Sequence, residues 1–364
     1  MRAMVSPSAS ADALLEKARR VARDVLAPNA NTVDDSERVP HQNLRALAEE
    51  GLFALAVPTA HGGAGAPPRV LRRFHGILAE ACGTTAFVSI QHATACTQIT
   101  RSPSESLRAR LLPRMARGDL MGAPAFSHLR RPGPPAVRVT EEPDALVFDG
   151  VAPWVTGWGA IGLITLGGTL PDGRFLHAAL VLDDTPGIKA WPPMRLATMS
   201  ASATVSLTLS RARVPLDHLL FVTTPEEARA ADAAGTLNQA ACSLGAATAA
   251  ASLLRARADE DPTVTPFAEA LRAQIDACWS DLETWADRPD DPAFPASALA
   301  VRAHAIELGI RAATAAIVAT GGTALKRDRD AQRIYREAAL YAVAPQTSAL
   351  RRATLTRLLE PHRA

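Results

Sequence analysis

The stretch that decides the fold runs from Thr320 to Arg352 and reads TGGTALKRDRDAQRIYREAALYAVAPQTSALRR. The glycine pair Gly321–Gly322 closes one apolar helix, because glycine readily adopts the backbone conformations at which helices end. The run Arg336–Ala338 opens the next helix, and the pair Thr347–Ser348 follows it. The stretch therefore predicts two long C-terminal helices, residues 297–320 and 329–359, on either side of the glycines.

Composition limits the classes of protein to which the chain can belong. Its 364 residues include 39 basic and 37 acidic side chains, and a net charge of +2 gives no reason to expect nucleic acid or a membrane as a partner. The N-terminus lacks a basic-then-apolar signal, and no run of 18 apolar residues occurs, so we expect a cytoplasmic protein. The cysteines lie far apart, without a C-x-x-C pair, and are predicted to be reduced, buried thiols: Cys82, Cys96, Cys242 and Cys278.

The order of predicted elements is helix, strand, helix. Residues 11–116 show helical periodicity, and short β-prone runs bounded by turn residues alternate from Met121 to about Leu220. Strands at this spacing are typical of a small antiparallel sandwich or barrel, and the chain is helical again from about Gly235. One strand segment between two helical segments predicts an α+β protein.

Five fragments, in this order, carry a resemblance to the acyl-CoA dehydrogenase superfamily. They are Gly51 to Gly65, Leu112 to Gly118, Asp149 to Thr156, Arg213 to Pro215, and the C-terminal stretch quoted above. The resemblance implies an N-terminal helical domain (1–118), a middle antiparallel β-sandwich or barrel (119–224) and a C-terminal four-helix bundle (225–364). It also implies FAD as cofactor and a homodimer or homotetramer, with a heteromer as the alternative.

Several residues match the superfamily's flavin contacts. Trp154 and Thr156 correspond to its stacking Trp and its Thr near the reactive ring nitrogen, and i, i+2 spacing on a strand puts both side chains on one face. The alternative is a core tryptophan and an edge-strand threonine, and for the glycine pair a simple helix cap. The remaining implied flavin contacts are Phe126, Ser127, Gly321, Gly322 and Thr347.

Three departures concern the cofactor grip and the catalytic base. Pro345 occupies the position of the catalytic Glu, and proline has no group that can remove a proton. Residues 261–265 read DPTVT where the superfamily has R-x-x-F-G for the FAD pyrophosphate. Arg130 and Arg131 replace a small Gly/Ser run and are candidates for binding a phosphate or carboxylate, with a remodelled surface loop as the alternative.

Two histidines are candidates for replacing the missing base. His92 lies on the helix that lines the acyl pocket in the superfamily, and His128 replaces the Glu of its flavin-edge motif. Imidazole acts as an acid or a base near neutral pH, although either ring is equally explained as a hydrogen-bonded, partly buried side chain. The histidine spacing predicts no metal site.

The sequence therefore supports three functions. The first is an FAD-dependent oxidoreductase that acts on an acyl thioester or a small related substrate with a non-standard base. The second is a flavin-dependent monooxygenase of the same fold, which uses loosely bound reduced flavin and needs no Glu. The third is a catalytically silent subunit of a heteromeric acyl-CoA dehydrogenase.

Overall fold

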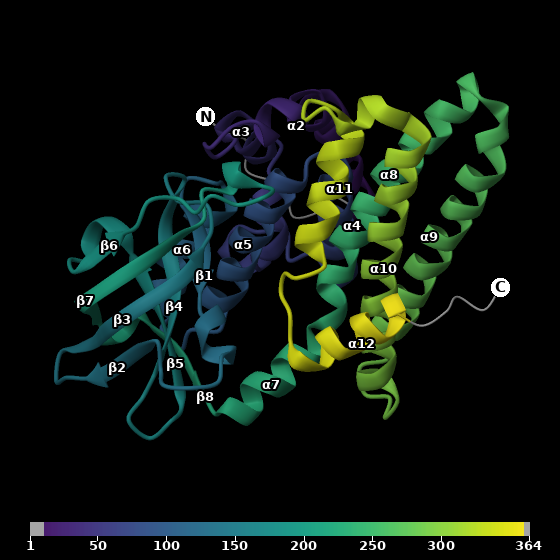
Figure 1. The fold of residues 1–364 in the computed structure, drawn as a ribbon. Coiled ribbons are helices and arrows are strands. Elements are labelled where there is room, and N and C mark those ends of the chain that lie inside the picture. The colour runs from purple at the N-terminus through teal and green to yellow at the C-terminus, as the bar shows by residue number, and fades with distance from the viewer. Residues whose placement is uncertain (1–10, 360–364) are drawn as a thin grey trace.

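The computed structural model describes residues 11–359, in which helices, a sheet and further helices follow one another along the chain (Figure 1). The first helical segment consists of amphipathic helices, whose apolar faces bury residues such as Leu14, Leu47 and Phe74. Its helices are α1 Ala11–Val21, α2 Ala27–Asp34, α3 His41–Glu49, α4 Pro68–Ala81, α5 Gly83–Thr100 and α6 Glu105–Ala116.

The middle segment is one mixed, eight-stranded sheet. Its path runs β6-β7-β3-β2-β4-β5-β8, and β1 pairs with β4 beside that path. The prediction of an antiparallel sheet is wrong for two pairings, because β1 and β2 both run parallel to β4. The strands are β1 Met121–Ala125, β2 Val137–Glu141, β3 Ala145–Val155, β4 Ile161–Thr169, β5 Phe175–Val181, β6 Ile188–Ala190, β7 Val205–Pro215 and β8 Leu219–Thr223.

The C-terminal helices form a bundle on the side of the molecule away from the sheet (Figure 1). Helix α8 packs against both α4 and α10, and small residues allow the close approach: a Cβ on Gly245 would lie 2.4 Å from the Gly76 carbonyl oxygen. The helices are α7 Pro225–Ala234, α8 Ala240–Glu260, α9 Thr265–Ala286, α10 Phe294–Thr320, α11 Asp330–Tyr341 and α12 Ser348–Leu359. The α+β fold with helical ends is therefore confirmed.

Two helix predictions need correction. The segment 329–359 is not one helix, because residues 342–347 form a turn between α11 and α12 around Pro345. Arg336–Ala338 do not open a helix either: α11 begins at Asp330, six residues earlier. Helix α10 is long and apolar enough to span a membrane by length and composition. It lies in the bundle as a core helix, packed against α8, α9, α11 and α12.

Candidate functional site

A β-bulge presents Trp154 at the surface. Ala152 pairs with Leu207 and Val155 with Val205, so two residues of β3 face one residue of β7. Trp154 takes a left-handed φ of 62°, a conformation that costs a bulky side chain energy, and its indole is 47% exposed. Bulges of this kind re-aim side chains next to functional sites. The i, i+2 argument is therefore wrong: β3 ends at Val155, and Thr156 is buried rather than exposed beside Trp154.

The segment beside Thr156 concentrates further backbone strain. Met199 (φ 54°) and Ala203 (φ 46°) are also left-handed, and they flank the short helix Ser200–Ser202 before β7. The Gly157 amide donates to the Ser202 carbonyl oxygen over 2.7 Å, which fastens this turn to the end of β3. Left-handed residues other than glycine cluster at functional sites, where the surrounding structure holds them in place. We refer to residues 154–158 and 199–204 together as the strained seat.

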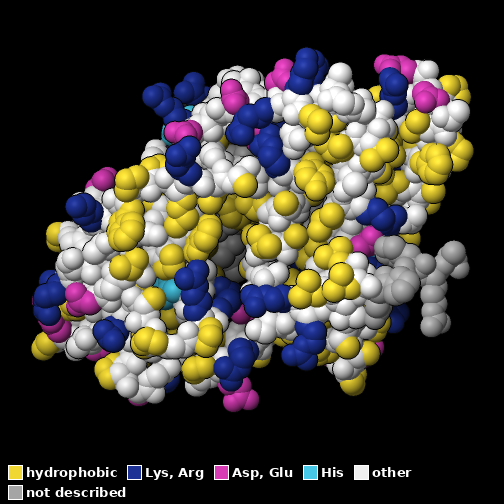
Figure 2. All heavy atoms as spheres, in the orientation of Figure 1, with side chains coloured by type: hydrophobic (Ala, Val, Ile, Leu, Met, Phe, Trp, Pro, Cys, Tyr) yellow, Lys and Arg dark blue, Asp and Glu magenta, His cyan; other side chains and the backbone are white. Residues whose placement is uncertain are grey.

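The strained seat was not found from the sequence. Its one local signal is the run of small residues Ser200-Ala201-Ser202-Ala203-Thr204, which fits a tightly folded segment but does not specify a left-handed backbone. Figure 2 shows a hollow between the sheet and the C-terminal helices, with apolar side chains around it and Lys and Arg side chains along one edge.

Residues Phe126 to Arg130 follow β1 and divide between exposed and buried positions. Ser127 is exposed, and Phe126 is half-buried with the Arg130 guanidinium 5.0 Å from its ring centre. Arg130 also donates two hydrogen bonds, of 2.6 and 2.5 Å, to the Asp232 carboxylate on α7. This guanidinium is therefore paired within the chain, and the loop after β1 is tied to the start of the C-terminal helices.

His128 is a buried residue of this loop. Its Nε2–H donates to the Gly167 carbonyl oxygen over 2.9 Å, and its buried Nδ1 has no hydrogen-bond partner. Burial lowers the pKa of His128 to about 4, so the ring is neutral near pH 7. A neutral imidazole held in this way can accept a proton only at the buried Nδ1.

His92 is a structural residue. The Gly122 amide donates to its Nδ1 and its Nε2–H donates to the Met115 carbonyl oxygen, both over 3.1 Å. Burial lowers the pKa of His92 to about 4. Its hydrogen bonds join α5 to α6 and to the start of β1, whereas His128 follows the other end of that strand. The structure does not bring the two rings together as a catalytic pair.

The turn between α11 and α12 is exposed at Pro345, and the Arg302 side chain holds its backbone. The buried Arg302 guanidinium donates to the carbonyl oxygens of Tyr341 (3.1 Å) and Ala344 (3.3 Å), and to the Ser243 hydroxyl (3.2 Å). Burial lowers its pKa to about 10. Fixing the carbonyl groups on this turn holds its path, but it supplies no proton acceptor for chemistry.

The remaining predicted cofactor residues have local roles within the chain. The Thr347 hydroxyl accepts a hydrogen bond of 3.2 Å from the Leu350 amide at the start of α12. Gly321 has a left-handed φ of 73° at the end of α10, as a helix-terminating glycine does. A Cβ on Gly321 or Gly322 would meet nothing within 4 Å, so no part of the described chain requires their small size.

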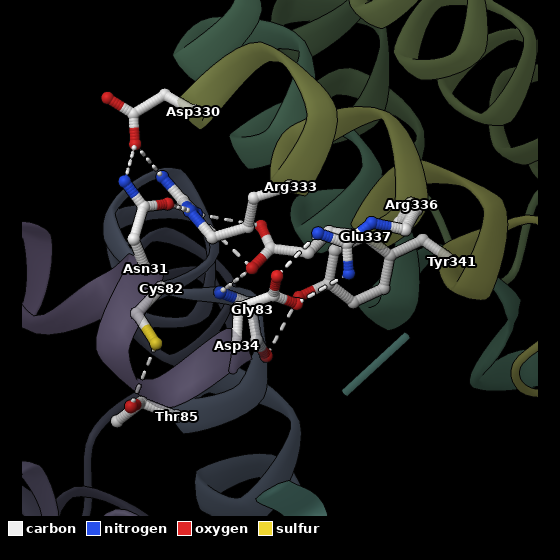
Figure 3. A network of polar contacts seen from close by, with 10 residues as sticks. All are labelled: Asn31, Asp34, Cys82, Gly83, Thr85, Asp330, Arg333, Arg336, Glu337 and Tyr341. Atoms are coloured by element: carbon white, nitrogen blue, oxygen red, sulfur yellow. Dashed lines mark hydrogen bonds and ion pairs between the residues drawn. The ribbon is translucent and has the colours of Figure 1, made fainter. Parts of the chain in front are cut away.

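A buried polar network joins α11 to the first helical segment (Figure 3). The Glu337 carboxylate accepts hydrogen bonds from the Gly83 amide (3.1 Å) and from Arg333 Nη1 (3.1 and 3.2 Å). The Tyr341 hydroxyl donates to the Gly83 carbonyl oxygen over 3.2 Å, so α11 binds both the amide and the carbonyl group of Gly83. Burial raises the pKa of Glu337, while Arg333 and the Gly83 amide act in the opposite direction.

A second ion pair extends the network. Arg336 donates to both oxygens of Asp34 at the end of α2, over 2.8 and 2.5 Å. The i, i+4 spacing of Arg333 and Glu337 was visible in the sequence, but their partners lie far away along the chain. Helix α11 therefore fixes the beginning of α5 and the end of α2, and it leads directly into the turn at Pro345.

The strained seat and residues 261–265, where the resemblance implies the FAD pyrophosphate, differ in how well they suit a flavin cofactor. An exposed indole with hydroxyls nearby is suited to a planar heteroaromatic ring. Residues 261–265 offer no basic or aromatic side chain, and Asp261 there accepts hydrogen bonds from the amide and hydroxyl of Thr263. The chain's own residues fit the tricyclic ring, but this segment does not fit a diphosphate. Within residues 11–359 no group of three or more metal-binding side chains occurs.

Comparisons with known proteins agree with this architecture. Residues 8–119 match the family described as Acyl-CoA dehydrogenase, N-terminal domain. The probable acyl-CoA dehydrogenase YngJ of Bacillus subtilis is 24% identical over 94% of this chain and 96% of its own length. An acyl-CoA dehydrogenase of the same organism is 26% identical, over 56% of this chain and 55% of its own length. The chain is thus similar to acyl-CoA dehydrogenases over nearly its whole length, and residues 8–119 match their N-terminal domain.

Solved structures with this fold include dehydrogenases and oxygenating enzymes. Butyryl-CoA dehydrogenase from Megasphaera elsdenii has a TM-score of 0.83 at 18% identity, covering 96% of this chain and 98% of its own. Nitrososynthase from Micromonospora carbonacea has a TM-score of 0.81 at 18% identity, covering 98% and 99%. Dibenzothiophene monooxygenase TdsC from Paenibacillus has a TM-score of 0.79 at 19% identity, covering 95% and 97%, and has been solved with FMN and indole. These likenesses concern the fold alone.

Proposed function

We propose that the protein is a flavin-dependent monooxygenase with the acyl-CoA dehydrogenase fold. The observation that carries the proposal is the strained bulge that presents the exposed Trp154 indole. The resemblance supports it as well, since Pro345 stands where the resemblance implies the dehydrogenase base. Reduced flavin supplies two electrons, so that one atom of O₂ enters the substrate and the other leaves as water. This reaction requires no carboxylate at residue 345.

The absence of a basic side chain at residues 261–265 supports the same proposal. A lost Arg–phosphate hydrogen bond typically forfeits roughly 1.5–3 kcal/mol, or about tenfold to a hundredfold in affinity. A monooxygenase that receives reduced flavin from a separate reductase tolerates such a loss, whereas an enzyme that retains FAD through many turnovers does not. We therefore propose reduced FMN or loosely bound reduced FAD as the cofactor and a small organic molecule as the substrate.

In this proposal the chain's own residues bind and position. Trp154 forms a wall for the ring, Thr156 and Ser127 supply hydroxyls, and the Arg130–Asp232 pair restrains the loop after β1. His92 and His128 hold the fold around the site through backbone hydrogen bonds. Neither ring is assigned a catalytic role.

Acyl-thioester dehydrogenation is the second candidate, and the near-full-length similarity to YngJ favours it. That reaction requires proton removal from the carbon next to the thioester carbonyl together with hydride transfer to the flavin. Pro345 has no proton acceptor and the unpaired His128 Nδ1 is buried, which is why this candidate comes second. A silent partner subunit is the third candidate.

One set of measurements separates these candidates. The purified protein is mixed with FMN or FAD and a flavin reductase with NADH, and oxygen uptake is measured with small organic substrates. Substrate-dependent oxygen uptake with an oxygenated product supports the monooxygenase. Anaerobic bleaching of bound oxidised flavin by acyl-CoA would instead establish the dehydrogenase. Absence of any flavin binding would leave the silent subunit.

We also propose a cytoplasmic homodimer or homotetramer that forms through the C-terminal helices. Seven exposed large apolar side chains lie between residues 318 and 359, and in one chain they face solvent: Val318, Leu325, Tyr335, Val343, Leu355, Leu358 and Leu359. The test is light scattering on wild type and on Leu355→Asp. A monomeric wild type would contradict the proposal.

A further inference from the structure

Three buried hydroxyls form a chain inside the strained seat. Thr204 Oγ1 lies 2.9 Å from Thr156 Oγ1 and 2.9 Å from Ser202 Oγ. All three side chains are buried, although Thr156 is only two residues from the exposed indole of Trp154. The chain of hydroxyls therefore begins inside the fold and ends next to the proposed ring-binding surface.

The three hydroxyl groups carry more protons than the two hydrogen bonds between them use. Each hydroxyl donates one hydrogen bond, so three hydroxyls carry three donors, but only two hydrogen bonds link them. None of the three has another acceptor among the described hydrogen bonds. In every arrangement one buried O–H is left to donate elsewhere, and a buried donor without an acceptor is costly.

Backbone hydrogen bonds fix the position at which the row of three hydroxyls ends. The Gly157 amide donates to the Ser202 carbonyl oxygen, and the Trp158 amide donates to the Ala203 carbonyl oxygen over 3.3 Å. The left-handed residues Met199 and Ala203 bend the turn so that Ser202 and Thr204 reach Thr156. If an acceptor lies against Trp154, one order satisfies all three donors: Ser202 to Thr204, Thr204 to Thr156, and Thr156 to the acceptor.

We propose that Thr204 is a positioning residue that directs the Thr156 hydroxyl proton toward a ring nitrogen of the flavin on Trp154. This inference rests on the proposed flavin binding. The ligand class that it defines is a planar heteroaromatic ring with an unprotonated nitrogen at its edge. Thr204 orients Thr156, and Ser202 supplies the first donor of the sequence.

The three hydroxyls are expected to contribute differently to FMN affinity, so the three substitutions give distinguishable results. Thr156→Val removes the donor and is expected to weaken FMN binding about tenfold. Thr204→Val frees the Thr156 hydroxyl among its three staggered rotamers, and a loss of about threefold is expected. Ser202→Ala still leaves Thr204 no acceptor except Thr156, so affinity is expected to stay within about twofold of wild type.

The experiment measures binding of oxidised FMN by fluorescence quenching, in parallel with 5-deaza-FMN, in which a C–H replaces the ring nitrogen. Wild type is expected to prefer FMN, and Thr156→Val is expected to abolish the preference. Thr204→Ser, which keeps the hydroxyl, is expected to restore the affinity lost in Thr204→Val. Thr248→Val is the matched control, because that part-buried hydroxyl donates to the Leu244 carbonyl oxygen within α8, outside the strained seat.

The outcomes separate this inference from the proposed function. A folded wild type that binds no flavin overturns the proposed function and the inference with it. A wild type that binds FMN and 5-deaza-FMN equally well overturns the inference alone. The same holds if Ser202→Ala weakens binding as much as Thr204→Val, because both residues would then act only by packing. Melting temperatures of all variants exclude unfolding as the cause.

Discussion

Replacing Glu337 by Gln tests how α11 is held against the rest of the molecule. The substitution keeps the size of the side chain and removes its charge, which leaves the buried Arg333 guanidinium with Asp330 as its one remaining carboxylate partner. Breaking a buried ion pair from one side costs about 3–5 kcal/mol. Because Asp330 remains, we expect the lower end, about 3 kcal/mol. A chain of 364 residues has an unfolding entropy of about 0.8 kcal/mol per kelvin, so the melting temperature is expected to fall by about 4 °C.

The assay is thermal unfolding followed by circular dichroism at neutral pH. Asp276→Asn is the matched control, since it breaks the exposed pair with Arg272 and is expected to change the melting temperature by less than about 1 °C. Arg333→Met combined with Glu337→Leu removes both charges and is expected to be more stable than Glu337→Gln. A Glu337→Gln variant that melts within 1 °C of wild type would refute the claim that this carboxylate stabilises the fold. A double variant that loses as much stability as the two single substitutions added together would refute it as well.

Three further outcomes are expected. Asp232→Asn releases Arg130 from α7, so trypsin is expected to cut after Arg130 several times faster, as mass spectrometry of timed digests would detect, while stability changes by less than about 1 kcal/mol because the pair is partly exposed. Burial lowers the pKa of His177 to about 3, below its value of 6.5 in the unfolded chain, so unfolded chains bind more protons and stability falls as the pH drops from 6.5 toward 3; His177→Phe is expected to make this fall shallower, since His92 and His128 still contribute to it, and an unchanged slope would contradict this. Gly322→Ala meets no atom within 4 Å and is expected to leave the melting temperature unchanged; weaker flavin binding in this variant would show that a ligand or a second subunit approaches the glycine.

The order of elements could be predicted because it depends on local patterns. Helical periodicity and strand alternation are properties of neighbouring residues, and they placed the change from helices to strands close to Met121. The parallel pairing of β1 with β4 could not be predicted. It depends on the path that the chain takes through β2 and β3, which lie between β1 and β4 in the sequence, and nothing in the five residues of β1 specifies that path.

The types of the candidate site residues could be predicted from the sequence, but their hydrogen-bond partners and backbone conformation could not. A histidine at position 92 is chemically able to act as a base, and only the fold reveals that Met115 and Gly122 occupy both of its nitrogens. Trp154 was found through its resemblance, yet its left-handed backbone had no signal in the sequence, because that conformation normally selects glycine. The partner of Glu337 is the Gly83 peptide, 254 residues away, and such a contact depends on tertiary structure alone.

The cost of the strained seat argues against a silent scaffold. Left-handed backbone at a residue other than glycine costs about 1–3 kcal/mol, and Trp154, Met199 and Ala203 each adopt it within one small region. A chain that had lost its ligand would gain stability from any substitution that relaxed these residues. The turn at Pro345, in contrast, is satisfied within the chain, since Arg302 donates to two of its carbonyl oxygens. If a flavin ring lies on Trp154, the residues around it are held at an energetic cost while the turn at Pro345 is ordinary structure, and this division fits the proposed flavin enzyme without a carboxylate base.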